Sequence, residues 1–364
     1  MHVIFRADAS LRKGGGHIMR CLALADCIKN QGGRAHFVCS ETTADTERRI
    51  ERGGHSLSRI VIQHSAALAD AAWDRAIDDH PAQRSDAAHS LAVAADPRAD
   101  WVVMDHYALD RTWSSAIRPS ARVLVIDDLA NRPHDCDILL DQTFGRSTDS
   151  YSDLVPQGTD ILVGSAFALM RPEFSVARKA SLARKARIAP PERILISLGM
   201  TDPDGLSASM LDHVLAADDT IGIDVVAGSM SPGLSRLHAV AQRNARVRIH
   251  IDVTDMAELM QCADLAIGAA GSTSWERCCL GLPSLTLVLA ENQRLIGSHL
   301  ESAGAHRLAP DPASPAFTNA LSEILQDHAG RMEMSRRASM LVDGLGTQRV
   351  YDAMCARTKG AVHE

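Results

Sequence analysis

The sequence predicts an α/β protein with two doubly wound domains, each built on a parallel sheet that helices cover on both faces. Three observations indicate this class. Short apolar runs alternate with longer helical patterns along the chain, as in βαβ units. This alternation of strand and helix patterns occurs twice, on either side of a basic, Ala-rich stretch at 177–187 that leads to Pro190-Pro191. The length of 364 residues fits two domains of about 100–200 residues each.

The predicted strands are short and rich in branched apolar residues. They fall at 2–6, 35–39, 101–105, 123–127, 138–140 and 161–163 in the first half, and at 193–198, 222–227, 247–251, 265–268 and 284–287 in the second. Helical patterns lie between them at 18–31, 206–215, 256–261 and 274–280, and again from about 331 to 358. An Ala- and Asp-rich segment at about 64–98 predicts one or two surface helices and a loop, to which we assign no function.

The diproline marks the predicted domain boundary, because proline stops a helix and restarts the chain in extended form. We expect an N-terminal domain over residues 1–175, a C-terminal domain over 188–345, and a C-terminal helix and tail over 346–364. Open α/β sheets bind ligands beyond the carboxyl ends of their strands. If two such domains face one cleft, the residues that follow each strand would lie at that cleft.

Charge and composition exclude several functional classes. The net charge of −7 argues against a protein that coats nucleic acid, because phosphate binding needs a concentrated positive field. No apolar run has the length of a membrane span, and the start of the chain does not resemble a signal peptide. The eight cysteines form no C-x-x-C pair, and the histidines form no H-x-x-x-H or H-E-x-x-H motif. We therefore expect a cytoplasmic protein without metal, membrane insertion or nucleic-acid partner.

The turn after the first strand is the first candidate site. Asp8 ends the strand region, and Gly14, Gly15 and Gly16 would let the backbone approach a ligand closely. His17 stands where the next helix begins, and the positive end of a helix disfavours a protonated imidazole. A neutral His17 is able to act as a general base. The alternative is a flexible loop with a histidine near a helix cap. The turn does not match the dinucleotide motif G-x-G-x-x-G.

Polar residues also follow the third and fourth long apolar strands. The sequence Asp105-His106-Tyr107 comes after a buried-strand pattern, and His106 and Tyr107 could each donate a hydrogen bond or exchange a proton. Spacing alone favours a simpler interpretation, in which Asp105 caps the next turn and the other two are loop residues. The same holds for Asp127 and Asp128, where capping of a loop is the favoured interpretation.

The strongest local signal lies at 263–277, where a strand leads through a turn of small residues into a helix. Gly271, Ser272 and Thr273 offer free amides and hydroxyls to a phosphate group. Glu276 has two interpretations that geometry leaves open. It completes a capping box with Thr273, or it accepts hydrogen bonds from a ribose diol. A polar trio at 291–293 follows the next strand, at the same edge of the predicted sheet.

Together these motifs resemble a known family, the UDP-2,4-diacetamido-2,4,6-trideoxy-β-L-altropyranose hydrolases of pseudaminic acid biosynthesis. The resemblance runs from residue 1 to about 350. It rests on the order of five short motifs, which are F-R-x-D at 5–8, Gly16-His17 with Arg20-Cys21, Asp105-His106-Tyr107, G-S-A-F-A-L-M-R-P-E-F at 164–174, and G-S-T-S-W-E at 271–276. It implies two Rossmann-like domains of the glycosyltransferase-B architecture, similar to the transferase that adds N-acetylglucosamine to the lipid II precursor.

The resemblance also implies a role for each matching residue. His17 would be the catalytic base, Tyr107 would lie beside the sugar, and Glu276 would bind the uridine ribose. The remaining positions implied in substrate or UDP binding are Asp8, Gly14, Gly15, Gly16, Phe167, Gly271, Ser272, Thr273 and Asn292, with Ser272 and Thr273 on the diphosphate. Water activated by His17 would attack the anomeric carbon of a UDP-sugar substrate, with no cofactor and no metal.

Two departures from the family pattern stand out, and rival functions remain. Gly199-Met200 stands where two glycines are expected, and the segment at 64–98 is longer than the family needs. A glycosyltransferase of the same architecture would use an acceptor hydroxyl in place of water. A hydrolysing UDP-sugar 2-epimerase is a more distant rival, and a non-catalytic nucleotide-sugar sensor would not need His17.

Overall fold

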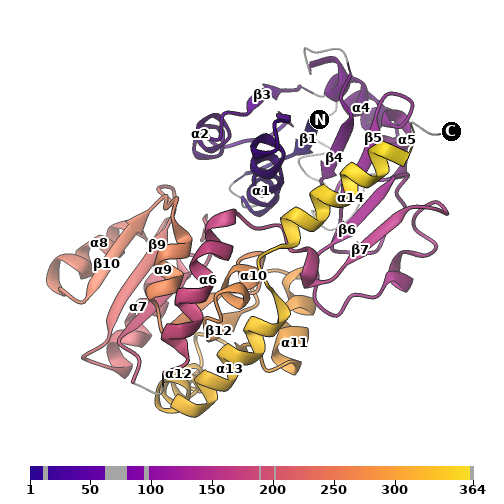
Figure 1. Ribbon diagram of the computed structural model, residues 1–364. Coiled ribbons are helices and arrows are strands. Elements are labelled where there is room, and N and C mark those ends of the chain that lie inside the picture. The colour runs from indigo at the N-terminus through magenta and orange to yellow at the C-terminus, as the bar shows by residue number, and fades with distance from the viewer. Residues whose placement is uncertain (11–14, 62–79, 94–97, 188–189, 201, 361–364) are drawn as a thin grey trace. The chain divides into compact units, whose positions relative to one another are not determined.

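The structure, a computed structural model, describes residues 1–10, 15–61, 80–93, 98–187, 190–200 and 202–360. The chain forms two compact units (Figure 1). Unit 1 combines Met1–Arg171 with Leu345–Glu364, and unit 2 comprises Pro172–Gly344. Each unit has one parallel sheet with helices between most of its successive strands, so the predicted fold class is confirmed.

Unit 1 is built on a seven-stranded sheet in the order β3-β2-β1-β4-β5-β6-β7. Its strands are β1 His2–Ala7, β2 Arg34–Cys39, β3 Ser56–Arg59, β4 Trp101–Asp105, β5 Arg122–Ile126, β6 Ile138–Asp141 and β7 Asp160–Val163. Its helices are α1 Gly16–Asn30, α2 Ala44–Arg52, α4 His80–Val93, α5 Arg111–Ile117 and α14 Gly346–Gly360, with 3₁₀ turns η1 Thr148–Tyr151 and η2 Ser165–Phe167. The strand order reverses between β1 and β4, which is the point where open α/β sheets bind ligands.

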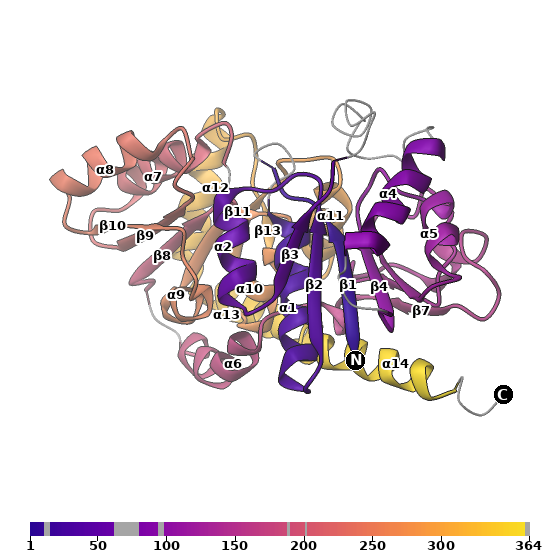
Figure 2. The ribbon, with the colours of Figure 1, turned by 90° about the horizontal axis from the view of Figure 1, so that it is seen from above.

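Helices cover both faces of this sheet, and a hydrophobic cluster lies on each face. Successive side chains of a strand point to opposite faces, so neighbouring residues fall in different clusters. Phe5 of β1 packs in the cluster that α1 and α14 cover, together with Leu24 and Val350. Its neighbour Ile4 packs on the other face with Trp113, where α4 and α5 lie. Figure 2 shows β2, β1 and β4 side by side, with α14 running past the end of β1 at which the chain begins. The polar residues at the strand ends are therefore held by a rigid frame.

Unit 2 is built on a six-stranded parallel sheet in the order β10-β9-β8-β11-β12-β13. Its strands are β8 Arg193–Ser197, β9 Gly222–Ala227, β10 Val247–Ile251, β11 Leu265–Ala269, β12 Ser284–Leu287 and β13 Arg307–Leu308. Its helices are α6 Pro172–Lys185, α7 Leu206–Ala217, α8 Leu234–Arg243, α9 Met256–Cys262, α10 Thr273–Cys279, α11 Gln293–Ser302, α12 Pro315–Gln326 and α13 His328–Leu341. Here the order reverses between β8 and β11.

The structure differs from the sequence prediction at the junctions. The basic stretch expected as a connection is the helix α6, and it belongs to unit 2, because the chain passes between units at Arg171 and Pro172. The helical pattern at 331–358 is two helices, α13 in unit 2 and α14 in unit 1. Within the segment at 64–98, α4 is described, and residues 62–79 and 94–97 lie outside the described part.

Candidate functional site

The switch point of unit 1 brings together His17 and Asp105. Ala7, the last residue of β1, pairs with Asp105, the last residue of β4, and α1 follows the turn after β1. His17 Nδ1 lies 2.5 Å from Asp105 Oδ1. The His17 side chain is 14% exposed and that of Asp105 is fully buried. A histidine that is reachable from solvent is therefore fixed by a carboxylate that is not.

Arg20 holds Asp105 in its ionised form. Its Nε and Nη2 each donate to one carboxylate oxygen at 2.7 Å. Burial alone would raise the pKa of Asp105, but the charge of Arg20 and the hydrogen bonds from Arg20 and His17 outweigh it and hold that pKa well below its usual range. An ionised carboxylate only accepts hydrogen bonds. The short contact with Asp105 therefore needs a hydrogen on His17 Nδ1, although Arg20 Nη2 also lies 3.2 Å from that nitrogen. With its hydrogen on Nδ1, an uncharged imidazole carries its lone pair on Nε2.

Tyr107 completes this group. Its ring meets that of His17 edge to face, with 4.7 Å between centroids. Its hydroxyl donates to Asp128 Oδ1 at 2.7 Å, and Arg20 Nη1 donates to the other oxygen of Asp128 at 3.0 Å. The guanidinium carbon of Arg132 lies 5.8 Å from the Tyr107 ring centroid. The structure thus places Tyr107, expected from the resemblance to lie beside the sugar, in contact with His17, the expected base.

The sequence assigns no part in chemistry to three members of this group: Arg20, Asp105 and Asp128. The capping prediction for Asp105 is wrong, because its carboxylate binds Arg20 and His17 of α1. For Asp127 it is confirmed, since Oδ2 accepts from the Ala130 amide at 2.9 Å. The spacing of His17 and Arg20 was an available signal, because residues three apart share one face of a helix.

Asp8 and His106 belong to a separate buried cluster. The Asp8 carboxylate accepts from Arg6 Nη1 at 2.6 Å and from the amide and hydroxyl of Ser40 at 2.8 and 2.6 Å. His106 Nε2 lies 3.0 Å from the same carboxylate, and its Nδ1 accepts from the Ala108 amide at 3.2 Å. Burial opposes the charge on Asp8, but Arg6 and His106 lower its pKa well below the usual value. The side chains of Asp8 and His106 are therefore hydrogen-bonded to other groups in the protein interior.

The other predicted positions of unit 1 lie around these clusters. Gly15 is the N-cap residue of α1 and Gly16 its first residue, while Gly14 falls outside the described residues. Phe167 ends the turn η2 and packs, partly buried, against the core cluster that contains Val350 of α14. At Gly346 an added Cβ would lie 2.6 Å from the Phe167 carbonyl carbon, so α14 approaches this turn closely.

In unit 2 the small-residue turn follows β11 as predicted, and α10 begins at Thr273. Its N-cap is Ser272, whose side chain makes no capping hydrogen bond. The first amides are bonded in other ways, since Ser274 N donates to the Gly271 carbonyl at 2.9 Å. A capping box would have Thr273 as the cap residue, whereas Thr273 is the first residue of α10 and Ser272 is its N-cap. The half-buried Glu276 side chain lies on the first turn of α10.

Asn292 lies beside this turn. It is the N-cap residue of α11, and the next residue, Gln293, accepts a hydrogen bond from the Leu289 amide at 2.9 Å. Gln293 Nε2 is 3.7 Å from the position that a Cβ on Gly271 would occupy. The turn after β11 and the start of α11 therefore adjoin at the carboxyl edge of the unit 2 sheet.

The turn after β8 has a different character. Asp202 accepts from the amides of Leu206 and Ser207 at 2.9 and 3.0 Å, so its own carboxylate occupies the start of α7. Gly199 has a φ of +105°, and the Met200 carbonyl oxygen lies 2.0 Å from where a Cβ on Gly228 would be. Of these two turns, the one after β11 is therefore better suited to an anion.

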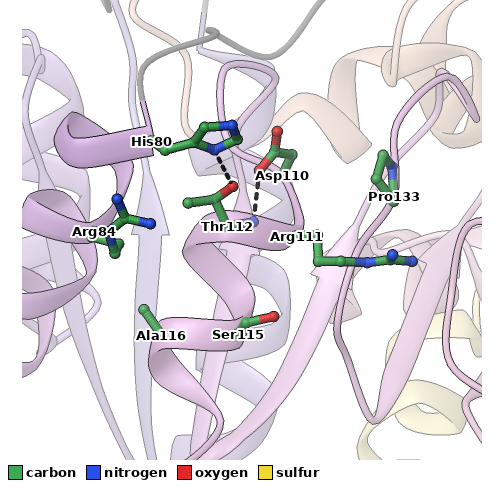
Figure 3. Close-up of a pocket in the computed structure, with 8 residues that line it drawn as sticks. All are labelled: His80, Arg84, Asp110, Arg111, Thr112, Ser115, Ala116 and Pro133. Carbon is green, nitrogen blue, oxygen red and sulfur yellow. Dashed lines mark hydrogen bonds between the residues drawn. The ribbon is translucent and has the colours of Figure 1, made fainter.

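A hollow of about 660 Å³ opens between α4 and α5 of unit 1 (Figure 3). Its lining residues are His80, Arg84, Asp110, Arg111, Thr112, Ser115, Ala116 and Pro133. His80 Nδ1 lies 2.6 Å from Thr112 Oγ1, and the Thr112 amide donates to Asp110 at 2.7 Å. None of the residues predicted from the sequence to act on a ligand lines it. Within the described residues, no three His, Cys, Asp or Glu side chains gather as metal ligands would.

The fold is that of the glycosyltransferase-B class, with two Rossmann-like units. MurG of Acinetobacter baumannii matches with a TM-score of 0.65 and 18% identity, over 98% of this chain and 99% of MurG. Anabaena HepE, in a structure with UDP-glucose, matches with a TM-score of 0.56 and 14% identity, over 98% of this chain and 100% of HepE. No helix in the described part of the chain is long and apolar enough to cross a membrane.

Comparison of sequences confirms the resemblance that the motifs predicted. The chain is 25% identical over 306 residues to the UDP-2,4-diacetamido-2,4,6-trideoxy-beta-L-altropyranose hydrolase of Campylobacter jejuni, covering 84% of this chain and 97% of that protein. It is also 25% identical to the spore coat polysaccharide biosynthesis protein SpsG of Bacillus subtilis, over 96% of both chains. An uncharacterized protein of Methanocaldococcus jannaschii is 23% identical over 81% of this chain, which spans only 57% of that protein. No family model matches the chain.

Proposed function

We propose that this protein is a cytoplasmic UDP-sugar hydrolase, which releases UDP and a free 2,4-diacetamido-2,4,6-trideoxyhexose in pseudaminic acid biosynthesis. The observation that carries the proposal is the hydrogen bond from His17 Nδ1 to the ionised Asp105, which leaves Nε2 as the basic atom of the ring. Among the described residues, no group hydrogen-bonds to that atom. The name of the Campylobacter relative supports the substrate and the reaction.

In the proposed reaction, His17 Nε2 takes a proton from water as the water oxygen attacks the anomeric carbon. The bond between that carbon and the diphosphate oxygen breaks, and UDP leaves with the electron pair. Asp105 stabilises the imidazolium that forms, since its carboxylate lies 2.5 Å from the other ring nitrogen. Tyr107, in edge-to-face contact with His17, would line the sugar.

Unit 2 would hold the nucleotide. Ser272 and Thr273 would donate to the diphosphate, whose developing charge needs preorganised donors. Glu276, on the first turn of α10, would accept from the ribose diol. Gly271 would leave space for the ligand, since an added Cβ would meet no atom closer than 3.7 Å. Asn292, at the adjoining turn, would help to hold the substrate.

The experiment is incubation of the purified protein with candidate UDP-sugars in ¹⁸O-labelled water, with excess EDTA and no acceptor. We expect UDP release, with the label in the free sugar. Label in UDP would mean attack at phosphorus and would contradict the role of His17. The His17→Asn variant should bind UDP but turn over about 10²–10⁴ times more slowly, the usual range for a lost general base.

A glycosyltransferase is the second candidate, since the fold is shared with MurG and relatives such as SpsG are named for polysaccharide biosynthesis. The same base would then deprotonate an acceptor hydroxyl. UDP release that stays at background until a sugar or lipid acceptor is added would establish this reading. A sensor would bind the UDP-sugar without any turnover.

A further inference from the structure

Arg277 of α10 is a buried cation that, among the described residues, makes no hydrogen bond or ion pair to a carboxylate, although the charge of the adjacent Glu276 raises its pKa. The residue is 3% exposed. Its Nη2 donates to the Ala269 carbonyl at 2.8 Å and to Ser274 Oγ at 3.0 Å, and its Nη1 donates to Thr273 Oγ1 at 3.1 Å. All three acceptors are neutral. Burial lowers the pKa of Arg277 to about 10, so the guanidinium remains charged at neutral pH.

A glycine of the preceding strand, β11, leaves the space that the Arg277 guanidinium occupies. A Cβ added at Gly268 of β11 would lie 2.6 Å from Arg277 Nη1 and 3.1 Å from Cζ. Glycine at this position therefore leaves the volume that the guanidinium fills. The charge lies directly behind the turn that runs from Ala269 to Ser274, and burial shields it from direct contact with a ligand.

A buried charge is costly unless it is compensated. Three neutral acceptors would be satisfied by a neutral donor, so the positive charge exceeds what the turn needs as an internal clamp. An anion at the outer side of the turn would compensate it. The hydrogen bond from Arg277 also orients the Thr273 hydroxyl. Because Thr273 Oγ1 accepts from Arg277, the hydroxyl hydrogen of Thr273 is left to donate to another group.

The neighbouring turn after β8 provides a contrast within the same sheet. There the carboxylate of Asp202 caps α7, so a negative charge stands where a phosphate would approach. The positive charge of Arg277 distinguishes the turn after β11 from it.

We infer that Arg277 is a positioning residue for the diphosphate of a nucleoside diphosphate ligand. It supplies the charge and acts through the hydroxyl of Thr273, which makes the contact. The inference rests on the proposed function and deepens it, because it predicts that affinity in unit 2 depends on the number of phosphates.

The test is calorimetric titration of the wild-type protein, Arg277→Gln and Arg277→Lys with uridine, UMP and UDP. We expect Arg277→Gln to weaken UDP binding about 10- to 100-fold, UMP binding less, and uridine binding by less than about twofold. Arg277→Lys keeps the charge and should stay within about threefold to fivefold of wild type for UDP. Added salt should weaken UDP binding less in Arg277→Gln than in wild type.

Two further variants keep the inference falsifiable where Arg277→Gln folds poorly. Gly268→Ala retains the arginine but displaces the guanidinium, and it should also weaken UDP binding more than uridine binding. Arg331 of α13 is the matched control, because it too is buried and donates to the carbonyls of Ile324 and Leu325. Arg331→Gln should lower thermal stability and leave UDP affinity unchanged.

The outcomes separate this inference from the proposed function. If wild type binds UDP and the variants lose affinity equally for all three ligands, Arg277 is only an internal clamp and the inference is overturned while the function stands. If wild type binds none of the three, the proposed function is overturned, and the inference with it.

Discussion

Replacing Asp105 by asparagine should abolish most of the turnover while leaving the protein folded. The change keeps the shape of the side chain and removes its charge. Asp105 Oδ1 lies 2.5 Å from His17 Nδ1, which places the centres of charge about 4 Å apart when the ring is protonated. At an effective dielectric constant of about 20, that attraction is about 4 kcal/mol, or about 10³-fold in rate. An asparagine amide that faces Nδ1 would also reverse the tautomer and block Nε2.

The assay is steady-state UDP release, with UDP affinity measured in parallel. UDP affinity should be unchanged, because the proposed nucleotide contacts lie in unit 2. Asp86→Asn is the matched control, since Asp86 is also fully buried and also binds an arginine through two nitrogens, Arg6 Nε and Nη2. Both variants lose a buried ion pair, which costs about 3–5 kcal/mol when one partner is removed, so both should unfold at lower temperature.

Only Asp105→Asn should lose turnover beyond what unfolding explains. Combining it with His17→Asn should cost little more than His17→Asn alone, because residues that act as a unit are not additive. Turnover of Asp105→Asn within about threefold of wild type, or a loss equal to that of Asp86→Asn, would refute the role of Asp105 in orienting the base.

Three further predictions follow from single contacts. Glu276→Ala should weaken UDP binding by about 1–3 kcal/mol in calorimetry with little change in thermal midpoint, and the reverse pattern would favour a structural role. Gly346→Ala should destabilise unit 1 by about 1–3 kcal/mol in denaturant titration, because the new Cβ would lie 2.4 Å from the Ala168 carbonyl oxygen; an unchanged midpoint would contradict this. Folding lowers the pKa of Asp8 and Asp105, so the stability they contribute is complete above their unfolded value of about 4 and is lost as the pH falls below it; equal unfolding free energies at pH 3 and pH 7 would argue against this.

The strands could be predicted from the sequence because each is a local run of apolar residues. Trp101–Asp105, Gly222–Ala227, Val247–Ile251 and Ser284–Leu287 have the predicted limits. The two missed strands, β3 Ser56–Arg59 and β13 Arg307–Leu308, lie at sheet edges, where fewer side chains are buried and the apolar pattern is weak.

The positions of the candidate site could be predicted for the same local reason, since polar residues after a strand mark the carboxyl edge of a sheet. Their contacts could not. His17 and Asp105 are 88 residues apart, and they meet because β1 and β4 are neighbours in the sheet. Strand order is a property of the whole unit, so the spacing of either motif carries no information about the other. The same limit explains why Asp105 looked like a capping residue.

The two histidines at this edge show how such contacts separate structure from chemistry. His17 and His106 each contact a buried aspartate that an arginine also binds. In His106 the second nitrogen already accepts from the Ala108 amide, so both nitrogens are used inside the protein. In His17, Nδ1 donates a hydrogen bond to the Asp105 carboxylate and, among the described residues, no group is hydrogen-bonded to Nε2. Residue type and neighbouring charge are alike in the two cases, and what makes His17 the candidate base is the nitrogen left to accept a proton from a substrate or from water.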